Sequence, residues 1–383
     1  MIAWFRYICL IVSLIITMPE LLSAQRLVSQ RQEDVEAGLL YNESVYILSN
    51  YSCLSSNSPE KLSLDELLRK QIEGFYFYLK RDTETNVLLL RKPDGTFTPF
   101  SESLEAIKTA LDADSTKVMT LFLDFYVETE LESSFKEIGL MEYVLEYDTK
   151  NGWPSLKDML SSGKRLVVFE VQKHLNSPSW LHNMRDFVEH TDADWGNQPE
   201  GVESFDERLK KNLSLFTGYK FLETSRGNSN DISALARQTP YLIESFKRAW
   251  IRDGRVPNFI LVDKYYAWLD VSLVTFRNFD IIYGAVTNNN ELLNYVNWDG
   301  MSNYTTGKYC FPLEPGAELM LSPISPGYRI EPATVYVSGT QRKAFASDFK
   351  ARPLRIDEDI EIYLPFEGCL LYTSDAADDL LCV

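Results

Sequence analysis

The sequence predicts an α/β fold: an irregular, TIM-like (β/α) barrel followed by a β-rich, sandwich-like C-terminal region. Three observations lead to this prediction. Short apolar runs alternate with helical stretches over residues 44–290, and several runs are apolar throughout, as in parallel strands covered on both faces. About eight such strands with helices between them are typical of a (β/α) barrel. A doubly wound open sheet is the second choice, because no Gly-rich phosphate loop follows any strand.

The predicted strands are short and rich in aliphatic and aromatic residues. In chain order they read SVYILS (44–49), GFYFYLK (74–80), NVLLL (86–90), VMTLFLDF (118–125), RLVVFEV (165–171), YKFLET (219–224), NFILVD (258–263) and IIYGAV (281–286). Helices are predicted between them, over 63–72, 101–112, 154–164 and 231–254. Ser63 and Glu66 form a capping-box pattern at the start of the first helix, and Gly163 provides a stop for the third.

Composition limits the classes of partner. The chain has 383 residues and a formal net charge of −17, so we expect no nucleic-acid partner, because no basic stripe offsets phosphate repulsion. Residues 1–24 have the pattern of a signal peptide: a short apolar run, ICLIVSLIIT, follows Arg6, and LLSAQ then offers the small residue Ala24. We therefore expect a secreted, periplasmic or cell-surface protein with no membrane span once the signal is cleaved, with a retained anchor as the alternative.

The composition and the apolar pattern of the chain change after about residue 300. We expect a barrel domain over 35–295 and a truncated β-rich module over 300–368, where Pro and Gly recur between short alternating runs such as ATVYVSG and IEIYLPF. Residues 369–383 break from the preceding pattern, and we interpret them as a tail foreign to the protein. Cys53 and Cys310 remain for the folded part, and the sequence leaves open whether they pair.

Polar residues follow several of the predicted strands. In a barrel the functional groups lie at the carboxyl ends of the strands, which here carry Asn50, Lys80, Asp124, Glu170 and Asp263. Asp124, Glu170 and Asp263 are the candidate catalytic residues, because converging carboxylates can act as acid and base or bind a divalent cation. Solvated or helix-capping polar residues are the competing interpretation of each position.

The three histidines, His174, His182 and His190, offer no familiar catalytic arrangement. They follow one another at intervals of eight residues in the connection after RLVVFEV, which is a poor spacing for a shared metal on one helix. We interpret them as ordinary helix or loop residues. The sequence also contains no G-x-S-x-G nucleophile elbow and no C-x-x-C pair.

Two stretches resemble a known family. GWPSLKDMLSSGKRLVVFEV (152–171) is similar to a stretch of phosphatidylinositol-specific phospholipase C-like phosphodiesterases, in which a W-P-T-L run and a helix lead into a strand bearing G-K-R-L-V-V-F. RVPNFILVDKYY (255–266) resembles the late strand of that family, which often reads R-P-N-x-x-x-x-D-F. The resemblance covers roughly residues 40–290, and it implies a somewhat irregular TIM-like barrel.

The resemblance also implies a chemistry that this sequence does not fully supply. The family uses one histidine as general base and a second as general acid, with an Arg or a bound Ca²⁺ to neutralise the phosphate. Asn50 falls at the position of the first histidine, and Arg91 or Lys92 at that of the second. Tyr78 and Lys80 fall near the family's strand-two Asp and Arg. Only Asp263 of the late strand matches.

Together these observations predict an exported protein with a phospholipase C-like phosphodiesterase fold that is catalytically degenerate. Asn50, Lys80, Arg91 and Lys92 are the residues predicted to bind a phosphorylated or acidic head group of the inositol or sugar type. No cofactor is required, although the family resemblance allows Ca²⁺. Two alternatives stay open: an active phosphoric diester hydrolase that uses the rim carboxylates with or without a divalent cation, and a cell-surface scaffold that binds glycan or protein.

Overall fold

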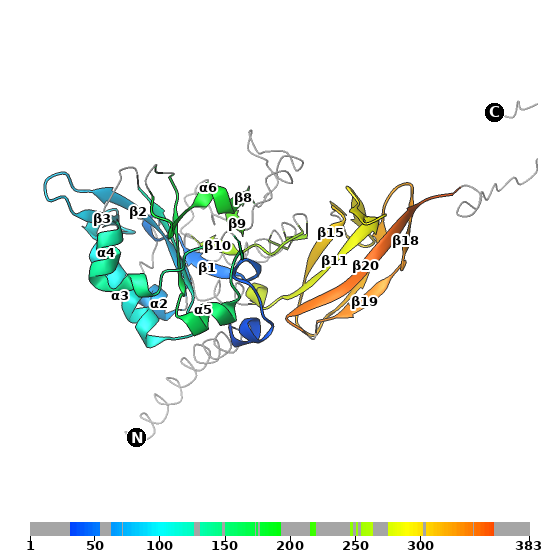
Figure 1. Ribbon diagram of the computed structural model, residues 1–383, viewed down its shortest axis with the longest axis horizontal. Helices are drawn as coiled ribbons and strands as arrows, with labels where there is room; N and C mark the ends of the chain where they lie inside the picture. Colours follow the sequence, from blue (N-terminus) through cyan, green and yellow to red (C-terminus); the bar gives the residue numbers. More distant parts are fainter. Residues whose placement is uncertain are drawn as a thin grey trace, which may run out of the picture.

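The computed structural model of the protein consists of an α/β region built on a parallel sheet and a β-rich region that follows it (Figure 1). It describes residues 31–53, 63–70, 72–125, 131–147, 150–172, 174, 177–192, 215–219, 246–247, 250–251, 254–262, 275–301, 304–339 and 341–355. Within these ranges no helix has both the length and the apolar character needed to cross a bilayer. The predicted signal peptide and the predicted foreign tail both lie outside the described residues.

Eight strands of the α/β region form one all-parallel sheet in the order β7-β6-β5-β2-β1-β10-β9-β8. Their bounds are β1 (Tyr46–Ser49), β2 (Gly74–Arg81), β5 (Met119–Asp124), β6 (Leu166–Glu170), β7 (Leu181–Asn183), β8 (Val188–Asp192), β9 (Leu215–Tyr219) and β10 (Phe259–Val262). No described hydrogen-bond ladder joins β7 to β8. However, only the single turn α6 (Met184–Phe187) separates these two strands. The stretch 181–192 therefore pairs with β6 through its first part and with β9 through its last, and connects both edges of the sheet.

Aromatic side chains show that this sheet is strongly curled. The ring of Phe259 on β10 lies 5.2 Å from that of Phe122 on β5 and 6.1 Å from that of Phe169 on β6. β6 and β10 are four strand positions apart in the sheet, which in a flat sheet would separate them by about 19 Å. The rings meet only because the sheet wraps around them. This confirms the predicted barrel-like α/β architecture and defines its inner face.

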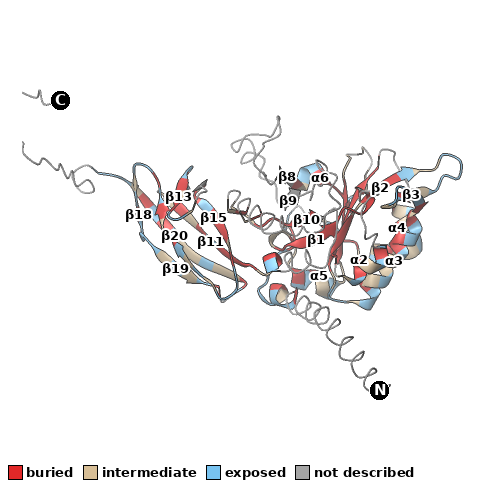
Figure 2. Cartoon of the chain, turned by 180° about the vertical axis from the view of Figure 1, so that it is seen from behind, coloured by how far each residue is buried: buried red, intermediate tan, exposed pale blue. Residues whose placement is uncertain are grey.

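Helices cover the outer face of the sheet. Figure 2 shows the strands almost wholly buried and the helices exposed on their outward side. On that face Phe100, at the start of α3, packs edge-on against Phe77 of β2 at 5.9 Å. The described helical segments include η1 (Tyr41–Glu43), η2 (Tyr51–Cys53), α2 (Leu64–Arg69), α3 (Phe100–Ala113), α4 (Leu131–Ile138), η3 (Leu140–Glu142) and α5 (Leu156–Ser162), together with helical residues 31–36, 246–247, 250–251 and 275–277.

The predicted helix-start and helix-stop residues are found at the ends of helices in the structure. The Ser63 hydroxyl accepts a hydrogen bond from the Glu66 backbone N–H at 3.3 Å, while the Glu66 carboxylate accepts from the Ser63 N–H at 2.7 Å. This reciprocal pair is the predicted capping box at the start of α2. Gly163 ends α5 with φ of 73°, a left-handed conformation that glycine adopts without steric cost. Both predictions are confirmed.

Two predicted barrel strands belong elsewhere. NVLLL forms β3 (Leu88–Arg91), which continues from β2 as an antiparallel hairpin and pairs on its other edge with β4 (Phe97–Pro99). IIYGAV lies in β11 (Asp280–Asn288), a central strand of the second region. The barrel instead uses the short strands β7 and β8, which sequence reasoning missed. The boundary between the regions therefore lies between residues 262 and 280 rather than at 295–300.

The β-rich region is a sandwich of antiparallel and mixed sheets around its own aromatic core. Trp298 lies 4.8 Å from Tyr309 and 5.0 Å from Phe311, ring to ring, and the three side chains are buried. Its strands after β11 are β12 (Glu291–Leu292), β13 (Val296–Trp298), β14 (Tyr304–Thr305), β15 (Lys308–Leu313), β16 (Glu318–Leu321), β17 (Pro323–Ile324), β18 (Tyr328–Glu331), β19 (Val335–Ser338) and β20 (Lys343–Pro353). The predicted strand ATVYVSG corresponds to β19, whereas IEIYLPF lies outside the described residues.

Cys310 is a free, buried thiol. Its Sγ accepts a hydrogen bond from the indole N–H of Trp250 at 3.1 Å, and burial raises the pKa of the thiol to about 12. The structure therefore contains no Cys53–Cys310 disulfide. A thiol with so high a pKa is unreactive at neutral pH.

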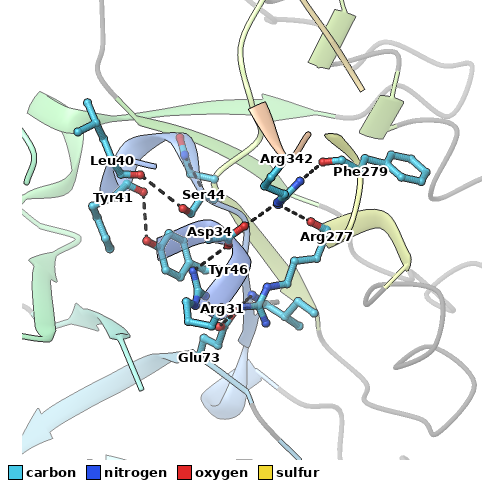
Figure 3. Close-up of polar contacts among 12 residues, drawn as sticks. Arg31, Asp34, Leu40, Tyr41, Ser44, Tyr46, Glu73, Arg277, Phe279 and Arg342 are labelled. Carbon is cyan, nitrogen blue, oxygen red and sulfur yellow. Dashed lines mark hydrogen bonds and ion pairs between the residues drawn. The ribbon is translucent and has the colours of Figure 1, made fainter. Parts of the chain in front are cut away.

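A buried charge cluster joins the two regions beneath the barrel (Figure 3). It consists of Arg31, Asp34, Glu73, Arg277 and Arg342, all less than 10% exposed. Asp34 accepts from Arg342 Nε at 2.6 Å and pairs with Arg31 Nη1 at 3.4 Å. Glu73 pairs with Arg31 and, at 3.0 Å, with Arg277 Nη2. The cluster thus ties the N-terminal helical residues, the entry to β2 and the entry to β20 together.

The cluster holds three guanidinium groups against two carboxylates. Burial and repulsion from Arg31 lower the pKa of Arg277. Arg342 offsets part of its own desolvation by donating to the backbone oxygens of Arg277, at 2.6 Å, and of Phe279. Because a buried charge is tolerated only while its partners remain, each member depends on the others.

We expect Arg342→Met to lower the free energy of unfolding by about 3–5 kcal/mol, because it leaves the Asp34 carboxylate buried with its best partner removed. The neighbouring Lys343→Met is the matched control. Lys343 pairs with Glu43 at 2.6 Å at a more exposed position, so its loss should cost under about 1 kcal/mol. Urea unfolding measures both, and similar losses in the two variants would contradict the assigned role of the cluster.

Gly74 provides a second stability test. A Cβ at Gly74 would lie 2.2 Å from the backbone oxygen of Thr120 in the adjacent strand β5, and that oxygen moves only if the β2–β5 ladder moves. Gly74→Ala should therefore cost about 3 kcal/mol or more. Gly163→Ala meets no neighbouring atom and carries only the cost of a left-handed backbone, about 1 kcal/mol. Equal thermal shifts for the two variants would refute the close approach at Gly74.

Candidate functional site

The candidate site is the inner rim at the carboxyl ends of the barrel strands. Residues paired across parallel strands point to the same face, and successive residues of a strand alternate between faces. Tyr76 pairs with Phe122, whose ring lies in the barrel interior, and Tyr78 pairs with Asp124. The inner face of β2 and β5 therefore ends in two tyrosines and one carboxylate.

Tyr76 and Asp124 form the central polar contact of the rim. The Tyr76 hydroxyl donates to Asp124 Oδ2 at 2.7 Å. Asp124 is 9% exposed, and among the described residues its Oδ1 has no hydrogen-bond partner. Because a buried carboxylate oxygen is costly to leave without a donor, Asp124 Oδ1 is an acceptor available to a ligand hydroxyl or a water molecule.

Asn50 lies directly after β1, as the sequence predicts, and is 3% exposed. It stands two residues beyond Leu48, which pairs with Gly74 on the inner face. The following turn η2 is fixed by Ser52, whose hydroxyl accepts from the Tyr78 N–H at 2.8 Å and donates to the Arg91 oxygen at 2.9 Å. Ser52 thus holds the exit of β1 against both β2 and β3.

The predicted cationic residues lie on the β2–β3–β4 hairpin. Lys80 and Arg91 share one face of this hairpin, since Lys80 pairs with Leu89 and Arg91 is two residues beyond Leu89. That face continues the inner face of β2, about 7 Å beyond Tyr78. Lys80 Nζ lies 3.8 Å from the centroid of the Phe97 ring, and Arg91 is exposed. Both cations are therefore at the edge of the site rather than within it.

Lys92 is separated from Arg91. Its backbone N–H donates to the Thr96 oxygen at 2.8 Å and so begins the turn that contains Pro93, Asp94 and Gly95. The alternation of the strand directs Lys92 away from the face that carries Lys80 and Arg91. The structure thus groups two of the three predicted cations.

Glu170 lies on the opposite face of the sheet from Asp124. Its register partner is Leu123, and its own neighbour Phe169 is the residue that packs into the interior. The Glu170 carboxylate accepts from Ser177 Oγ at 2.5 Å, His174 Nδ1 at 3.0 Å and Asn183 Nδ2 at 3.2 Å. It anchors the connection between β6 and β7. The expected convergence of Asp124 and Glu170 is therefore wrong, because strand alternation separates them.

Two of the three histidines lie in strands, whereas the sequence interpretation placed all three in helices or loops. His174 lies in the β6–β7 connection and stacks on Phe125 at 4.4 Å, whereas His182 and His190 lie in strands β7 and β8. His182 is buried, donates from Nε2 to the Leu145 oxygen at 3.2 Å, and packs against Trp153 and Phe169. Burial lowers its pKa, so it is a neutral core residue. The side chain of His190 is outside the described part of the chain.

Asp263, the predicted match to the family's late strand, also lies outside the described residues, directly after β10 in the sequence. Sequence reasoning missed Tyr76 and Ser52. Tyr76 could have been found by counting back two positions from Tyr78 along the predicted strand, since that period keeps a side chain on one face. No sequence pattern indicates the role of Ser52, because its two hydrogen bonds join it to backbone atoms 26 and 39 residues away.

Residues 90–199 match the family model described as PI-PLC X 1. This segment runs from the end of β3 past β8 and contains Asp124, Glu170 and all three histidines. This segment is therefore similar to the PI-PLC X family. The predicted resemblance is confirmed at the level of this segment, which contains residues 152–171, whereas residues 255–266 lie outside the match.

Solved structures of bacterial enzymes are also similar. The phosphatidylinositol-specific phospholipase C from Listeria monocytogenes matches with 14% identity and a TM-score of 0.40, over 64% of this chain and 98% of that one. A double mutant of the phosphatidylinositol-specific phospholipase C from Staphylococcus aureus matches with 14% identity and a TM-score of 0.39, over 63% and 93%. No curated protein matches the sequence significantly.

The PI-PLC resemblance allows Ca²⁺, but the described inner rim does not fit it. Ca²⁺ takes six to eight oxygen ligands, several of them carboxylates, and the described inner rim supplies Asp124 as its one carboxylate. The described residues also contain no group of three or more His, Cys, Asp or Glu side chains arranged to hold a metal. No step below is therefore assigned to a metal ion.

The buried His182 predicts a pH dependence of stability. Because its pKa is lowered in the folded state, the unfolded chain binds a proton first as pH falls, so stability is present above about pH 6.5 and is lost below it. His182→Gln can still donate to the Leu145 oxygen but cannot titrate. Between pH 7.5 and 5.5 the melting temperature of the wild type should fall further than that of the variant. Parallel decreases would contradict this assignment.

Proposed function

We propose that the inner rim binds the head group of a phosphorylated polyol of the inositol or sugar type, and that it does not hydrolyse the phosphodiester by a two-histidine mechanism. The Tyr76–Asp124 pair is the observation that carries this proposal. A buried carboxylate with one oxygen fixed by a tyrosine and the other available is suited to accept a hydrogen bond from a ring hydroxyl. Asn50, at the same rim, can both donate to and accept from a neighbouring hydroxyl.

The phosphate would lie toward the β2–β3 hairpin. Lys80 and Arg91 extend the inner face beyond Tyr78, and Arg91 is exposed and able to form a bidentate contact with a phosphate. The site has two cations at its edge and a carboxylate inside, and this arrangement would orient a bound ligand. The ring hydroxyls would approach Asp124 while the anionic end remains near the two cations.

Asn50 at the first key position and Arg91 or Lys92 at the second support the proposed loss of catalysis. Asn50 stands at the exit of β1, and an amide cannot take a proton from an attacking hydroxyl. Of the histidine side chains that the structure describes, His174 is stacked outside the inner face and His182 is buried against the Leu145 oxygen. General acid–base catalysis contributes typically 10²–10⁴-fold per group, so a rim without both groups would bind far better than it turns over.

The alternative hydrolase based on paired carboxylates finds less support. Such an enzyme needs an acid and a base that flank one ligand, and Glu170 is committed to the opposite face by Ser177, His174 and Asn183. We further propose, from the pattern of residues 1–24 alone, that the protein is exported. Its ligand would then be met outside the cytoplasm or at a cell surface.

Calorimetry with myo-inositol and with inositol 1-phosphate tests this proposal on the full chain. Asp124→Asn should weaken both ligands about ten-fold or more, because a charged acceptor is worth about 1.5–3 kcal/mol. The double variant Lys80→Ala/Arg91→Ala should weaken inositol 1-phosphate and leave inositol unchanged. Glu170→Gln is the matched control for Asp124→Asn, since it neutralises a carboxylate of β6 on the outer face.

Two results would contradict the proposal. The first is an equal effect of Asp124→Asn and Glu170→Gln on ligand affinity, which would remove the distinction between the faces. The second is robust turnover of phosphatidylinositol vesicles by the wild-type chain. Loss of that turnover in Asp124→Asn would then identify Asp124 as a catalytic residue.

A further inference from the structure

The β-rich region has an exposed, uncharged strip along the outer side of β16 and β17. Residues 318–324 run through these two strands with only Ser322 between them. Successive residues of a strand point to opposite faces. Leu321 and Pro323 are buried toward the core, whereas Met320 and Ile324 are 41% and 52% exposed. Two large apolar side chains of this stretch therefore face solvent.

Each of the two has a register partner that faces the same way. Met320 pairs with Tyr336 of β19, and Ile324 pairs with Asn297 of β13. Tyr336 is 74% exposed, and the valines on either side of it pack against the core of the region. Tyr336 thus offers most of its ring to a ligand.

Neutral hydrogen-bonding groups lie beside these side chains. The hydroxyls of Ser322 and Thr334 are hydrogen-bonded to each other at 2.8 Å, and such a pair keeps one further donor and several acceptor sites. Tyr295 is 41% exposed and donates from its hydroxyl to Asn297 Oδ1 at 3.0 Å. This contact engages the amide oxygen of Asn297, and the amide hydrogens can donate to a ligand. We call the following residues the neutral strip: Met320, Tyr336, Ser322, Thr334, Ile324, Asn297 and Tyr295.

The charges at the borders of the neutral strip are acidic. Glu318 lies two residues before Met320 on β16 and is exposed. Asp299 is also exposed, and its backbone N–H donates to the Ser322 oxygen at 3.0 Å. These carboxylates, in a chain of net charge −17, disfavour a sulfated, phosphorylated or otherwise anionic ligand. They can accept hydrogen bonds from hydroxyl groups, so the charge around the strip suits a neutral, hydroxyl-rich ligand.

The size of the neutral strip favours a narrow ligand over a protein partner. From Met320 through Ile324 to the level of Tyr295 it is roughly 20 Å long, and its two paired strands are about 10 Å wide. This area of roughly 200 Å² is well below the ~800 Å² that a stable protein–protein interface buries on each partner. A single oligosaccharide chain is both long and narrow, and several sugar units fit along the strip.

We propose that the neutral strip binds a neutral oligosaccharide or polysaccharide chain. Tyr336 and Tyr295 would contact the apolar faces of sugar rings, because exposed tyrosines supply a large contact area at a low cost in side-chain entropy. Asn297, Ser322 and Thr334 would form hydrogen bonds with sugar hydroxyls. The site belongs to the β-rich region and does not depend on the function proposed for the barrel rim.

Calorimetry of the full-length chain with maltohexaose, cellohexaose, mannohexaose and chitohexaose tests this proposal. At least one should bind, and its affinity should change less than about two-fold between about 0.05 and 0.5 M NaCl, because no ion pair is formed. Tyr336→Ala should weaken binding about ten-fold, because it removes apolar area that the ligand covers. Tyr336→Phe keeps the ring and should bind within about two-fold of the wild type.

Phe345→Ala is the matched control. Phe345 is an exposed aromatic residue of the same region, but it lies on β20 as the register partner of Tyr283, in the other sheet. Its loss should leave the affinity unchanged. Asp124→Asn should also leave it unchanged, since Asp124 belongs to the barrel rim. Circular dichroism checks that each variant is folded.

Three results would overturn the proposal. The first is that none of the four hexasaccharides binds, including the case in which the wild type self-associates and Tyr336→Ala does not, which would make the strip a contact between copies of the chain. The second is an equal loss of affinity in Phe345→Ala and Tyr336→Ala. The third is loss of binding in Asp124→Asn with Tyr336→Ala unaffected, which would assign the sugar to the barrel rim.

Discussion

The site depends on the contact of the Phe259 ring with the rings of Phe122 and Phe169. Rings from β10, β5 and β6 touch only if the parallel sheet curls through several strand positions. Once the sheet is curled, every strand has one face toward these rings and one toward the helices. The same alternation then assigns each polar residue at a strand end to the inner rim or to the outer surface. Asp124 and Glu170 end adjacent strands and yet are separated by this rule.

The two ends of the barrel have different roles: one holds the buried charge cluster and the other forms the candidate site. Beneath it, the buried charges of Arg31, Asp34, Glu73, Arg277 and Arg342 connect the N-terminal helical residues to the start of the β-rich region (Figure 3). At the opposite end, the rim presents Asn50 and the Tyr76–Asp124 pair. In barrels of this type chemistry gathers at the carboxyl ends of strands and stability at the amino ends. The cluster also sets where the β-rich region lies relative to the barrel, because Arg342 immediately precedes β20.

The sequence predicted more of the fold than of the site. Short apolar runs, the capping box at Ser63 and the stop at Gly163 are local signals, and each produced the expected element. It was harder to predict from the sequence which sheet each strand joins. Residues 88–91 and 280–288 have the composition of barrel strands, but one extends a hairpin and the other builds the second sheet. The composition of a strand indicates how far the strand is buried, but it does not indicate which strand it will pair with.

By itself, the sequence determined the α/β class, the phospholipase C-like resemblance and the residue types at the strand exits, Asn50 among them. Only the tertiary structure decided that Tyr76 orients Asp124 and that Glu170 anchors an outer connection. These outcomes depend on register between segments far apart in the chain. A shift of one residue in any ladder would exchange the two faces of a strand, and that choice is made by packing rather than by any local run of sequence.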